Sequence, residues 1–340
     1  MEVLRPIPQT GPARPAGAQT LAGGWCWFER VEVLARDAPP RIVAAAEIAP
    51  EALAALTAAP APFPGMRTDR PAVMGVLNAT PDSFSDGGRF IAPEAALAQG
   101  LRMAAEGADI LDIGGESTRP GAAPVPIAEE IARTAPLIAG LRAAGVRLPI
   151  SIDTRKARVA EAALDAGADM VNDVSALGFD PDLAPLVAAR GVPLCLMHMQ
   201  GTPETMQIDP RYDDVVLDVR AMLAARIAAA EAAGIARARI LIDPGIGFGK
   251  TAAHNLALGA RLSALHGMGC AVLYGASRKR FIGRLGGMGA EAPADRRLGG
   301  SIAVALAAAA QGAQVVRVHD VWETRQALDL WRASVTGEGA

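Results

Sequence analysis

Two polar segments carry most of the candidate chemistry in this chain. The first, Asn78–Gly88, follows directly on the apolar run Val73–Leu77, and the second, Gly114–Gly121, follows directly on Ile110–Ile113. Both segments combine amide, hydroxyl, carboxyl and guanidinium groups with glycines, a composition that packing alone explains poorly. We predict that they form the rim of an active site that binds a polyanion.

The elements that must position these segments form a regular series from residue 71 onward. Short β-like runs alternate with alanine-rich segments of helical character, which is the pattern of repeated βα units around a parallel sheet. The eight predicted strands are 73–77, 110–113, 148–152, 170–171, 192–197, 240–242, 271–273 and 315–318, and the clearest helices are Pro93–Ala105, Ile127–Ala143, Arg211–Ala233 and Val321–Ala333. Eight strands over about 260 residues predict an α/β fold of the (β/α)8 TIM-barrel type. An open doubly wound sheet is the alternative, but it usually has fewer strands, and no GxGxxG turn follows the first strand here.

The first 70 residues differ from this series. Proline-rich patches surround a Trp25–Phe28 cluster and two possible short strands, Val31–Leu34 and Arg41–Val43. We expect this part to pack on the main domain through its aromatic side chains. The predicted organisation is an N-terminal extension of unknown role (1–70), a catalytic domain (71–335) and a tail (336–340).

Composition and charge argue against several classes of protein. A formal net charge of −3 gives no basic surface for nucleic acid. The N-terminus lacks a basic segment followed by an apolar one, and the most apolar stretch, Ile302–Ala310, is too short to span a bilayer. Cys26, Cys195 and Cys270 have no metal-type spacing and are expected to be reduced core thiols. We therefore expect a cytoplasmic protein without nucleic-acid or membrane partners.

Polar side chains also follow every predicted strand. The active-site groups of a barrel come from the carboxyl ends of its strands and from the loops that follow them. In chain order these positions hold Asn78; Asp112 with Thr118 and Arg119; Asp153; Asn172; His198; Asp243; Ser277 with Lys279; and Arg317 with His319. Solvent exposure accounts for one or two such residues, whereas polar groups at all eight ends favour a shared site.

Four of these residues suit the recognition of a flat heterocycle. Asp153, Asn172, Asp243 and Lys279 would present two carboxylates, an amide and an ammonium to a ring with several N–H donors and a carbonyl acceptor. A ligand that lacks those groups leaves buried polar partners unsatisfied, so such a pocket discriminates strongly. Capping of the next helix is the alternative role for Asp153.

Three other residues suit anion binding. Arg119, Arg317 and His319 are cations or potential cations, and the loop glycines can present backbone N–H groups to phosphate oxygens. Asn78 offers a neutral oxygen for Mg²⁺, a cation that keeps several waters and bridges substrate phosphates. A structural ion pair with a nearby carboxylate is the alternative role for Arg119.

Two further features are weaker signals. Gly247–Thr251 resembles the end of a phosphate-binding P-loop, but Pro244 stands where that motif requires its first glycine. We interpret this stretch as a strand-to-helix loop whose Phe248 can stack on a ring. His198 fits either the pocket or the core.

The same residues resemble a known family. The motifs are Asn-x-Thr-Pro-Asp-Ser-Phe-Ser-Asp-Gly-Gly at 78–88, Gly-Glu-Ser-Thr-Arg-Pro-Gly-Ala at 115–122, Ser-Ile-Asp-Thr at 151–154, Asn-Asp-Val at 172–174, Met-His-Met-Gln-Gly at 197–201, Asp-Pro-Gly-Ile-Gly-Phe-Gly-Lys at 243–250, Gly-Ala-Ser-Arg-Lys at 275–279 and Arg-Val-His-Asp at 317–320. In type and order they resemble the bacterial dihydropteroate synthases, from residue 72 to 333. The extension is not covered by the resemblance.

The resemblance implies a transferase of folate biosynthesis. The family condenses 6-hydroxymethyl-7,8-dihydropterin pyrophosphate with p-aminobenzoate to give 7,8-dihydropteroate and pyrophosphate, and a homodimer, Mg²⁺ and sulfonamide targeting are expected with it. The implied site residues are Asp153, Asn172, Met197, Asp243, Phe248 and Lys279 for the pterin; Asn78, Thr118, Arg119, Arg317 and His319 for the pyrophosphate; Asn78 for the metal; and Phe84, Thr118, Pro120 and Ser277 for p-aminobenzoate. The expected catalytic residues are Asp112, Arg119, Asp153, Lys279, Arg317 and His319.

The residue types also favour one mechanism. No serine or cysteine with a paired base stands out, so a covalent enzyme intermediate is not indicated. We expect an SN1-like displacement in which Mg²⁺-assisted departure of pyrophosphate comes before attack by the amine. The two polar segments are expected to close once the pterin is bound. The alternatives are a pterin-binding methyltransferase barrel, which needs no pyrophosphate-binding cations, and a non-catalytic pterin- or folate-binding module.

Overall fold

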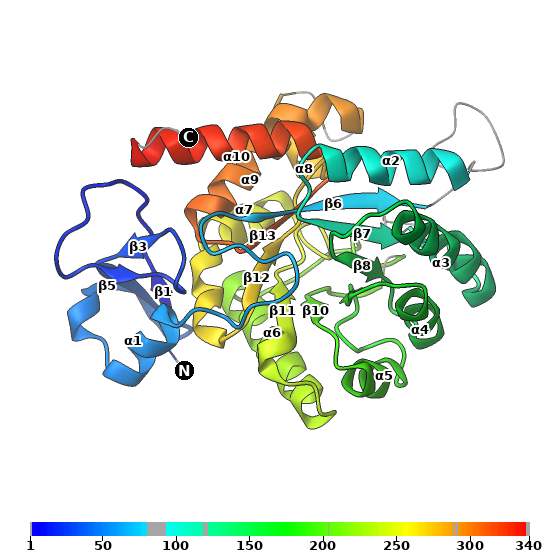
Figure 1. Cartoon of the computed structure of the whole chain (residues 1–340). Coiled ribbons are helices and arrows are strands. Elements are labelled where there is room, and N and C mark those ends of the chain that lie inside the picture. Colours follow the sequence, from blue (N-terminus) through cyan, green and yellow to red (C-terminus); the bar gives the residue numbers. More distant parts are fainter. Residues whose placement is uncertain are drawn as a thin grey trace.

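The computed structural model describes residues 2–79, 93–117, 122–202, 204–287, 289 and 292–337. Its centre is a closed barrel of eight parallel strands in the order β6-β7-β8-β9-β10-β11-β12-β13, with β13 paired to β6 (Figure 1). The strands are β6 (Ala72–Asn78), β7 (Ile110–Gly114), β8 (Ile150–Asp153), β9 (Met170–Asp173), β10 (Leu194–Met197), β11 (Ile240–Asp243), β12 (Ala271–Tyr274) and β13 (Val315–Val318). The predicted TIM barrel is confirmed.

Helices alternate with these strands and surround the barrel (Figure 1). They are α2 (Pro93–Ala105), α3 (Ile127–Ala143), α4 (Ala157–Asp165), α5 (Leu183–Arg190), α6 (Val215–Ala232), α7 (Ala252–Ala260), α8 (Arg280–Leu285), α9 (Leu298–Ala310) and α10 (Val321–Thr336). The predicted bounds of α2 and α3 are confirmed. The predicted start of α6 at Arg211 is wrong, because Asp214 caps the helix by accepting the backbone N–H groups of Val216 and Leu217.

The strands are nearly all buried, as expected where side chains fill the barrel and helices cover its outside. One cluster fills the amino end of the barrel, the end where the strands begin. It contains Met74, Ile110, Met170, Cys195, Leu241, Leu273 and Val315, together with Phe63 from the segment before β6. Phe63 therefore belongs to the barrel core although it precedes the first barrel strand.

The N-terminal extension has its own small core. An antiparallel sheet joins β1 (Val3–Pro6), β4 (Arg30–Ala35) and β5 (Ala38–Ala44), beside a hairpin of β2 (Gln19–Thr20) and β3 (Trp27–Phe28) and the helix α1 (Pro50–Thr57). Figure 1 shows it in blue at one side of the barrel. The predicted strands at 31–34 and 41–43 are confirmed within β4 and β5.

Polar and aromatic contacts attach the extension to the barrel. Trp25 Nε1 donates to the carbonyl of Ala309 at the end of α9, at 2.9 Å. Arg5 Nη2 donates to Ala260 O at 2.9 Å, and Ser263 Oγ donates to Pro6 O at 2.7 Å. The expected packing through aromatic side chains is confirmed for Phe63, which lies in the barrel cluster, and hydrogen bonds of Trp25 and β1 are added to it.

Candidate active site

The carboxyl ends of the strands bring together polar residues that are far apart in the sequence. Parallel pairing sets Asn78 opposite Gly114, Gly114 opposite Asp153, and Asp153 opposite Asn172. Met197 on β10 lies opposite Asp243 on β11. The register of the barrel strands therefore decides which of these polar residues are neighbours in the ring. No local sequence pattern shows this.

A buried ion cluster lies at the centre of this ring. Arg317 on β13 donates through Nε to Asp112 Oδ2 at 2.6 Å and through Nη2 to Asp153 Oδ2 at 2.7 Å. Asn172 Nδ2 donates to the same Asp112 oxygen at 3.1 Å. One guanidinium thus serves two carboxylates, and the cluster keeps a net negative charge when both are ionised.

The surplus of negative charge affects the protonation of the cluster. Burial raises the pKa of Asp153 to about 7, and the positive charge of Arg317 opposes this shift without cancelling it. Burial would lower the pKa of Arg317, but the charges of Asp112 and Asp153 outweigh it and raise that pKa. Among the buried side-chain atoms of the described residues, Asp112 Oδ1 has no hydrogen-bond partner. The cluster therefore has acceptor capacity left for a ligand that donates N–H groups.

Asp243 forms a second acceptor site at the end of β11. Its Oδ1 accepts the backbone N–H of Gly245 at 2.7 Å, and burial nevertheless raises its pKa to about 6. Lys279 supplies a favourable charge nearby, and its Nζ lies 4.0 Å from the centre of the Phe248 ring. Phe248 also packs with Met197 in a small buried apolar cluster. A flat ring placed here would meet a carboxylate, an ammonium and apolar side chains together.

Ser277 and His319 lie together at the ends of β12 and β13. The Ser277 hydroxyl is 3.1 Å from His319 Nδ1 and accepts the backbone N–H of His319 at 3.2 Å. The residues that follow them in the two loops, Arg278 and Asp320, form an ion pair. The structure thus brings together two residues that were predicted to contact different substrates.

The structure settles the open question about His198. Its Nδ1 is 2.9 Å from Lys250 Nζ, and Lys250 also donates to Phe248 O at 3.0 Å. Burial is the main cause that lowers the pKa of His198 to about 3 and the pKa of Lys250 to about 7. His198 therefore supports the loop that carries Phe248 from inside. Sequence reasoning missed Lys250 in this role, although the lysine of the 243–250 motif was a visible signal.

Phe84, Thr118, Arg119 and Pro120 lie outside the described residues. Asn78 is half-buried. Its Oδ1 and the side chain of Asp153 both lie next to Gly114, on the side where a Cβ atom would point. The described residues contain no group of three or more His, Cys, Asp or Glu side chains that could hold a metal ion. A single neutral oxygen suits Mg²⁺, which takes most of its ligands from water and phosphate. The residues present fit a metal that is bound jointly with the substrate.

The fold and this ring of strand-end residues define a class of barrel enzyme. The chain belongs to the family of pterin-binding enzymes, whose model matches residues 74–319. Relatives at 45–50% identity are dihydropteroate synthases. The one from Neisseria meningitidis is 50% identical over 270 residues, which cover 78% of this chain and 93% of the relative.

Solved structures agree with this assignment. The Xanthomonas albilineans dihydropteroate synthase with 4-aminobenzoic acid is 53% identical with a TM-score of 0.73, covering 78% of this chain and 93% of that one. The same enzyme in complex with 7,8-dihydropteroate has 50% identity, a TM-score of 0.70 and coverage of 78% and 94%. A Yersinia pestis dihydropteroate synthase in a sulfonamide drug complex has 46% identity, a TM-score of 0.73 and coverage of 78% and 94%.

These findings confirm the resemblance drawn from the motifs. The protein is a transferase of the dihydropteroate synthase family, and its reaction is the condensation of dihydropterin pyrophosphate with p-aminobenzoate. The methyltransferase barrel and the non-catalytic binding module are thereby set aside. Among the described residues, no helix is long and apolar enough to cross a membrane.

Proposed function

We propose that the enzyme forms dihydropteroate by an SN1-like displacement that is stabilised by the Asp112–Arg317–Asp153 cluster. The bond between the pterin methylene carbon and the pyrophosphate oxygen breaks first, and its electron pair leaves with pyrophosphate. The nitrogen of p-aminobenzoate then donates its lone pair to the methylene carbon and loses one proton to solvent water. The observation that carries this proposal is the buried cluster in which two carboxylates share one guanidinium.

The carboxylates contribute in two ways. As the C–O bond breaks, positive charge develops on the methylene and spreads into the ring, and buried negative charge stabilises it more strongly than water would. Asp153, Asn172 and Asp243 also accept or donate hydrogen bonds at the ring edge and fix its orientation. Lys279 completes the polar edge, while Met197 and Phe248 hold the faces of the ring.

Arg317 can serve the pyrophosphate as well as the two acids. Its hydrogen bonds to Asp112 and Asp153 use two of the five N–H donors of a guanidinium, and the other three can bind a leaving oxyanion. His319 and Ser277 lie beside it on the neighbouring loops, and Thr118 and Arg119 are assigned to the same pyrophosphate. Holding the two acids keeps the guanidinium in place for charge that appears only as pyrophosphate leaves.

Asn78 is the residue of this chain that would hold Mg²⁺. The cation, when bound, would neutralise charge on the departing pyrophosphate. Phe84, Thr118, Pro120 and Ser277 are assigned to p-aminobenzoate, and a sulfonamide is expected to compete for the same place.

We assign the protein to the cytoplasm and to a homodimeric state. The cysteines Cys26, Cys195 and Cys270 are buried and unpaired, which suits a reducing compartment. On α10, Trp322 and Leu330 expose 53% and 63% of their surface and support a partner surface on the last helices. Light scattering on the purified protein measures the mass and tests the dimer.

One experiment tests the mechanism. The purified protein is mixed with the pterin pyrophosphate and Mg²⁺, with and without p-aminobenzoate, and both pyrophosphate and dihydropteroate are followed. Pyrophosphate release without the amine, at a rate independent of amine concentration, is expected for the stepwise route. Release that strictly requires the amine and follows its nucleophilicity would overturn that route while leaving the overall reaction intact.

A further inference from the structure

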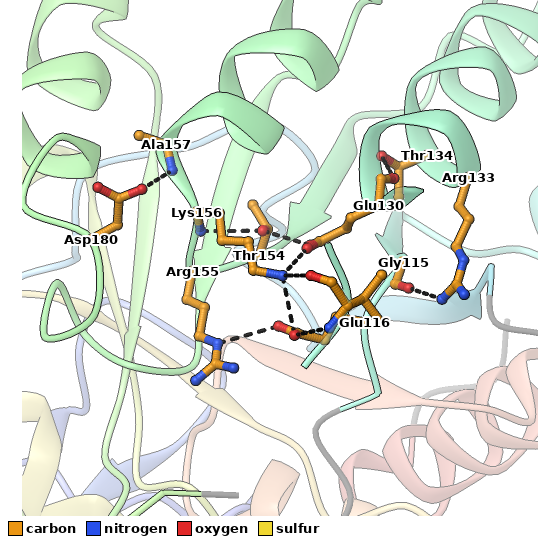
Figure 2. Close-up of polar contacts among 11 residues, drawn as sticks. Gly115, Glu116, Glu130, Arg133, Thr134, Thr154, Arg155, Lys156, Ala157 and Asp180 are labelled. Carbon is orange, nitrogen blue, oxygen red and sulfur yellow. Dashed lines mark hydrogen bonds and ion pairs between the residues drawn. The ribbon is translucent and has the colours of Figure 1, made fainter. Parts of the chain in front are cut away.

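A buried network of charges joins both ends of the connection between β7 and α3 (Figure 2). Its centre is Lys156, which directly precedes α4. The ammonium donates to Glu116 Oε1 at 3.1 Å, to the carbonyl of Val125 at 2.6 Å and to Glu130 Oε2 at 2.6 Å. These three bonds use the full donor capacity of an ammonium group. One side chain thus holds a residue before and a residue after the segment 117–124.

The acceptors of Lys156 are held by further contacts. Glu116 Oε1 also accepts the backbone N–H of Val125 at 2.9 Å, and Glu116 Oε2 accepts Arg155 Nε at 3.2 Å. Burial would raise the pKa of Glu116, but the Val125 N–H group and the two cations outweigh it and lower that pKa. Glu116 is therefore ionised, and it binds Val125 directly as well as through Lys156.

The network also reaches the strand that carries Asp153. Thr154 Oγ1 donates to Glu130 Oε1 at 2.7 Å, and Glu130 is fully buried on α3. In Figure 2 the Lys156 ammonium lies between Glu116 and Glu130, and a dashed line joins Thr154 to Glu130. The side chain of Lys156 is only 6% exposed, and its bonds to Glu116 and Glu130 are buried.

A purely structural explanation accounts for this network poorly. Burying charges costs desolvation energy, and well-packed apolar residues of similar volume are often as good or better for stability. What an apolar cluster could not supply is a directional link to two fixed points of the backbone. The geometry of Lys156 provides that link, because its three bonds converge from Glu116, Val125 and Glu130.

We propose that Lys156 is a positioning residue for the amine half of the reaction. By fixing Glu116 and Val125 relative to α3 and β8, it sets the two points between which the chain carries the residues assigned to p-aminobenzoate and pyrophosphate. This inference rests on the proposed function of that segment. The pterin ring is assigned to residues outside this segment, so binding of the amine and binding of the ring respond differently when Lys156 is changed.

The primary test is Lys156→Met, which keeps the aliphatic stem and removes the ammonium. The expected result is a roughly tenfold rise in the KM for p-aminobenzoate, equivalent to about 1.4 kcal/mol. The dissociation constant of the hydroxymethyl pterin, which lacks the pyrophosphate, is measured by calorimetry without the amine and is expected to stay within about twofold. An unchanged KM, or an equal loss of affinity for the amine and for the hydroxymethyl pterin, overturns the proposal.

Two further variants separate positioning from loss of folding. Lys156→Met combined with Glu130→Gln removes the uncompensated buried carboxylate, and the glutamine can still accept from Thr154. Glu116→Gln is nearly isosteric and weakens the same link. Both are expected to raise the KM for p-aminobenzoate selectively, and a wild-type KM in folded samples of both contradicts the proposal.

Arg325→Met provides the matched control. It also removes a buried cation, one whose guanidinium is ion-paired with Asp109 at the other end of the barrel at 3.3 Å. This variant is expected to lower the thermal midpoint without changing the KM for the amine. Failure of the proposed mechanism is distinguishable, because it shows in the wild-type enzyme as pyrophosphate release that requires the amine.

Discussion

Buried ion clusters lie at both ends of the barrel, and the two clusters have opposite ratios of carboxylate to guanidinium groups. At the carboxyl end, one guanidinium, Arg317, bonds two carboxylates, Asp112 and Asp153. At the amino end, one carboxylate, Asp109, bonds two guanidinium groups. Arg70 binds it through Nη1 and Nη2 at 2.7 and 2.9 Å, and Arg325 Nη1 lies at 3.3 Å.

This difference suits the amino end to stabilising the fold and the carboxyl end to binding a substrate. Asp109 also accepts the backbone N–H of Val73 at 2.8 Å, so both of its oxygens are bonded within the chain. At the carboxyl end, burial raises the pKa of Asp153 to about 7, and Asp112 Oδ1 has no hydrogen-bond partner within the described residues. At the amino end the Asp109 carboxylate is fully bonded, and among the described residues the buried atoms of its cluster without a hydrogen bond are two donors, Nε and Nη2 of Arg325, whereas the carboxyl end keeps an acceptor and negative charge for a substrate. The predictions below test this contrast.

Arg317→Ala is expected to have the largest effect. Turnover should fall on the order of 10²-fold or more, because the variant loses a donor aimed at developing charge and leaves two buried carboxylates without their cation. Single-turnover measurement of pyrophosphate release reports the loss directly. A variant that releases pyrophosphate at the wild-type rate removes Arg317 from the mechanism.

Asp243→Asn, at the carboxyl end, is expected to stabilise the ligand-free protein and to weaken its binding of the pterin. The pKa of Asp243 rises from 3.8 to about 6, so keeping it ionised in the folded protein costs about 3 kcal/mol. This cost is absent below pH 4 and complete above pH 6. The ligand-free variant should therefore exceed the wild type in thermal midpoint at pH 8, with a smaller gap at pH 5. Its KM for the pterin should rise about 10- to 100-fold, since a charged hydrogen bond is lost.

Arg325→Met tests the amino end. Loss of one guanidinium from Asp109 should lower the free energy of unfolding by about 2 kcal/mol, because Arg70 and the Val73 N–H group remain bonded to the carboxylate. Chemical denaturation measures this change, and steady-state assays should give kcat within about twofold of the wild type. A large fall in kcat with an intact fold would show that the amino end is not separate from catalysis.

The pH profile sharpens the same comparison. Ionised Asp243 is the form that accepts N–H groups from the ring, and burial raises its pKa to about 6. Asp153, with a pKa of about 7, titrates in the same site, so the kcat/KM for the pterin should fall below pH 7 and more steeply below pH 6. In Asp243→Asn the steeper part below pH 6 should disappear, and a steep part that persists assigns that titration to another group.

The smallest effect is expected on the extension, where Arg41 pairs with Glu2 at 3.1 Å and both side chains are 56% exposed. Exposed ion pairs contribute at most about 1 kcal/mol. Arg41→Ala should change neither the thermal midpoint nor kcat measurably. Any larger loss would mean that the extension supports the barrel through this edge.

The sequence predicted the fold well because its signals are local. Alternating apolar runs and alanine-rich segments identified the eight strands, and Pro93 and Ile127 begin α2 and α3 as expected. The error at α6 came from a competing signal, because the acidic pair before the helix includes the residue that caps it, Asp214. The predicted end of the last helix at Ala333 is wrong, since α10 extends to Thr336.

The sequence by itself determined the class of fold, the family and the set of strand-end residues, because periodicity and motifs depend on neighbours along the chain. Only the tertiary structure decided which of these residues touch. Arg317 lies 205 residues from Asp112 and 164 from Asp153, and these contacts exist because β13 pairs with β6 to close the barrel. The link from Lys156 to Glu116 and Val125 arises in the same way, from helices and strands packed side by side. Such partners follow from three-dimensional register, which no local pattern in the chain encodes.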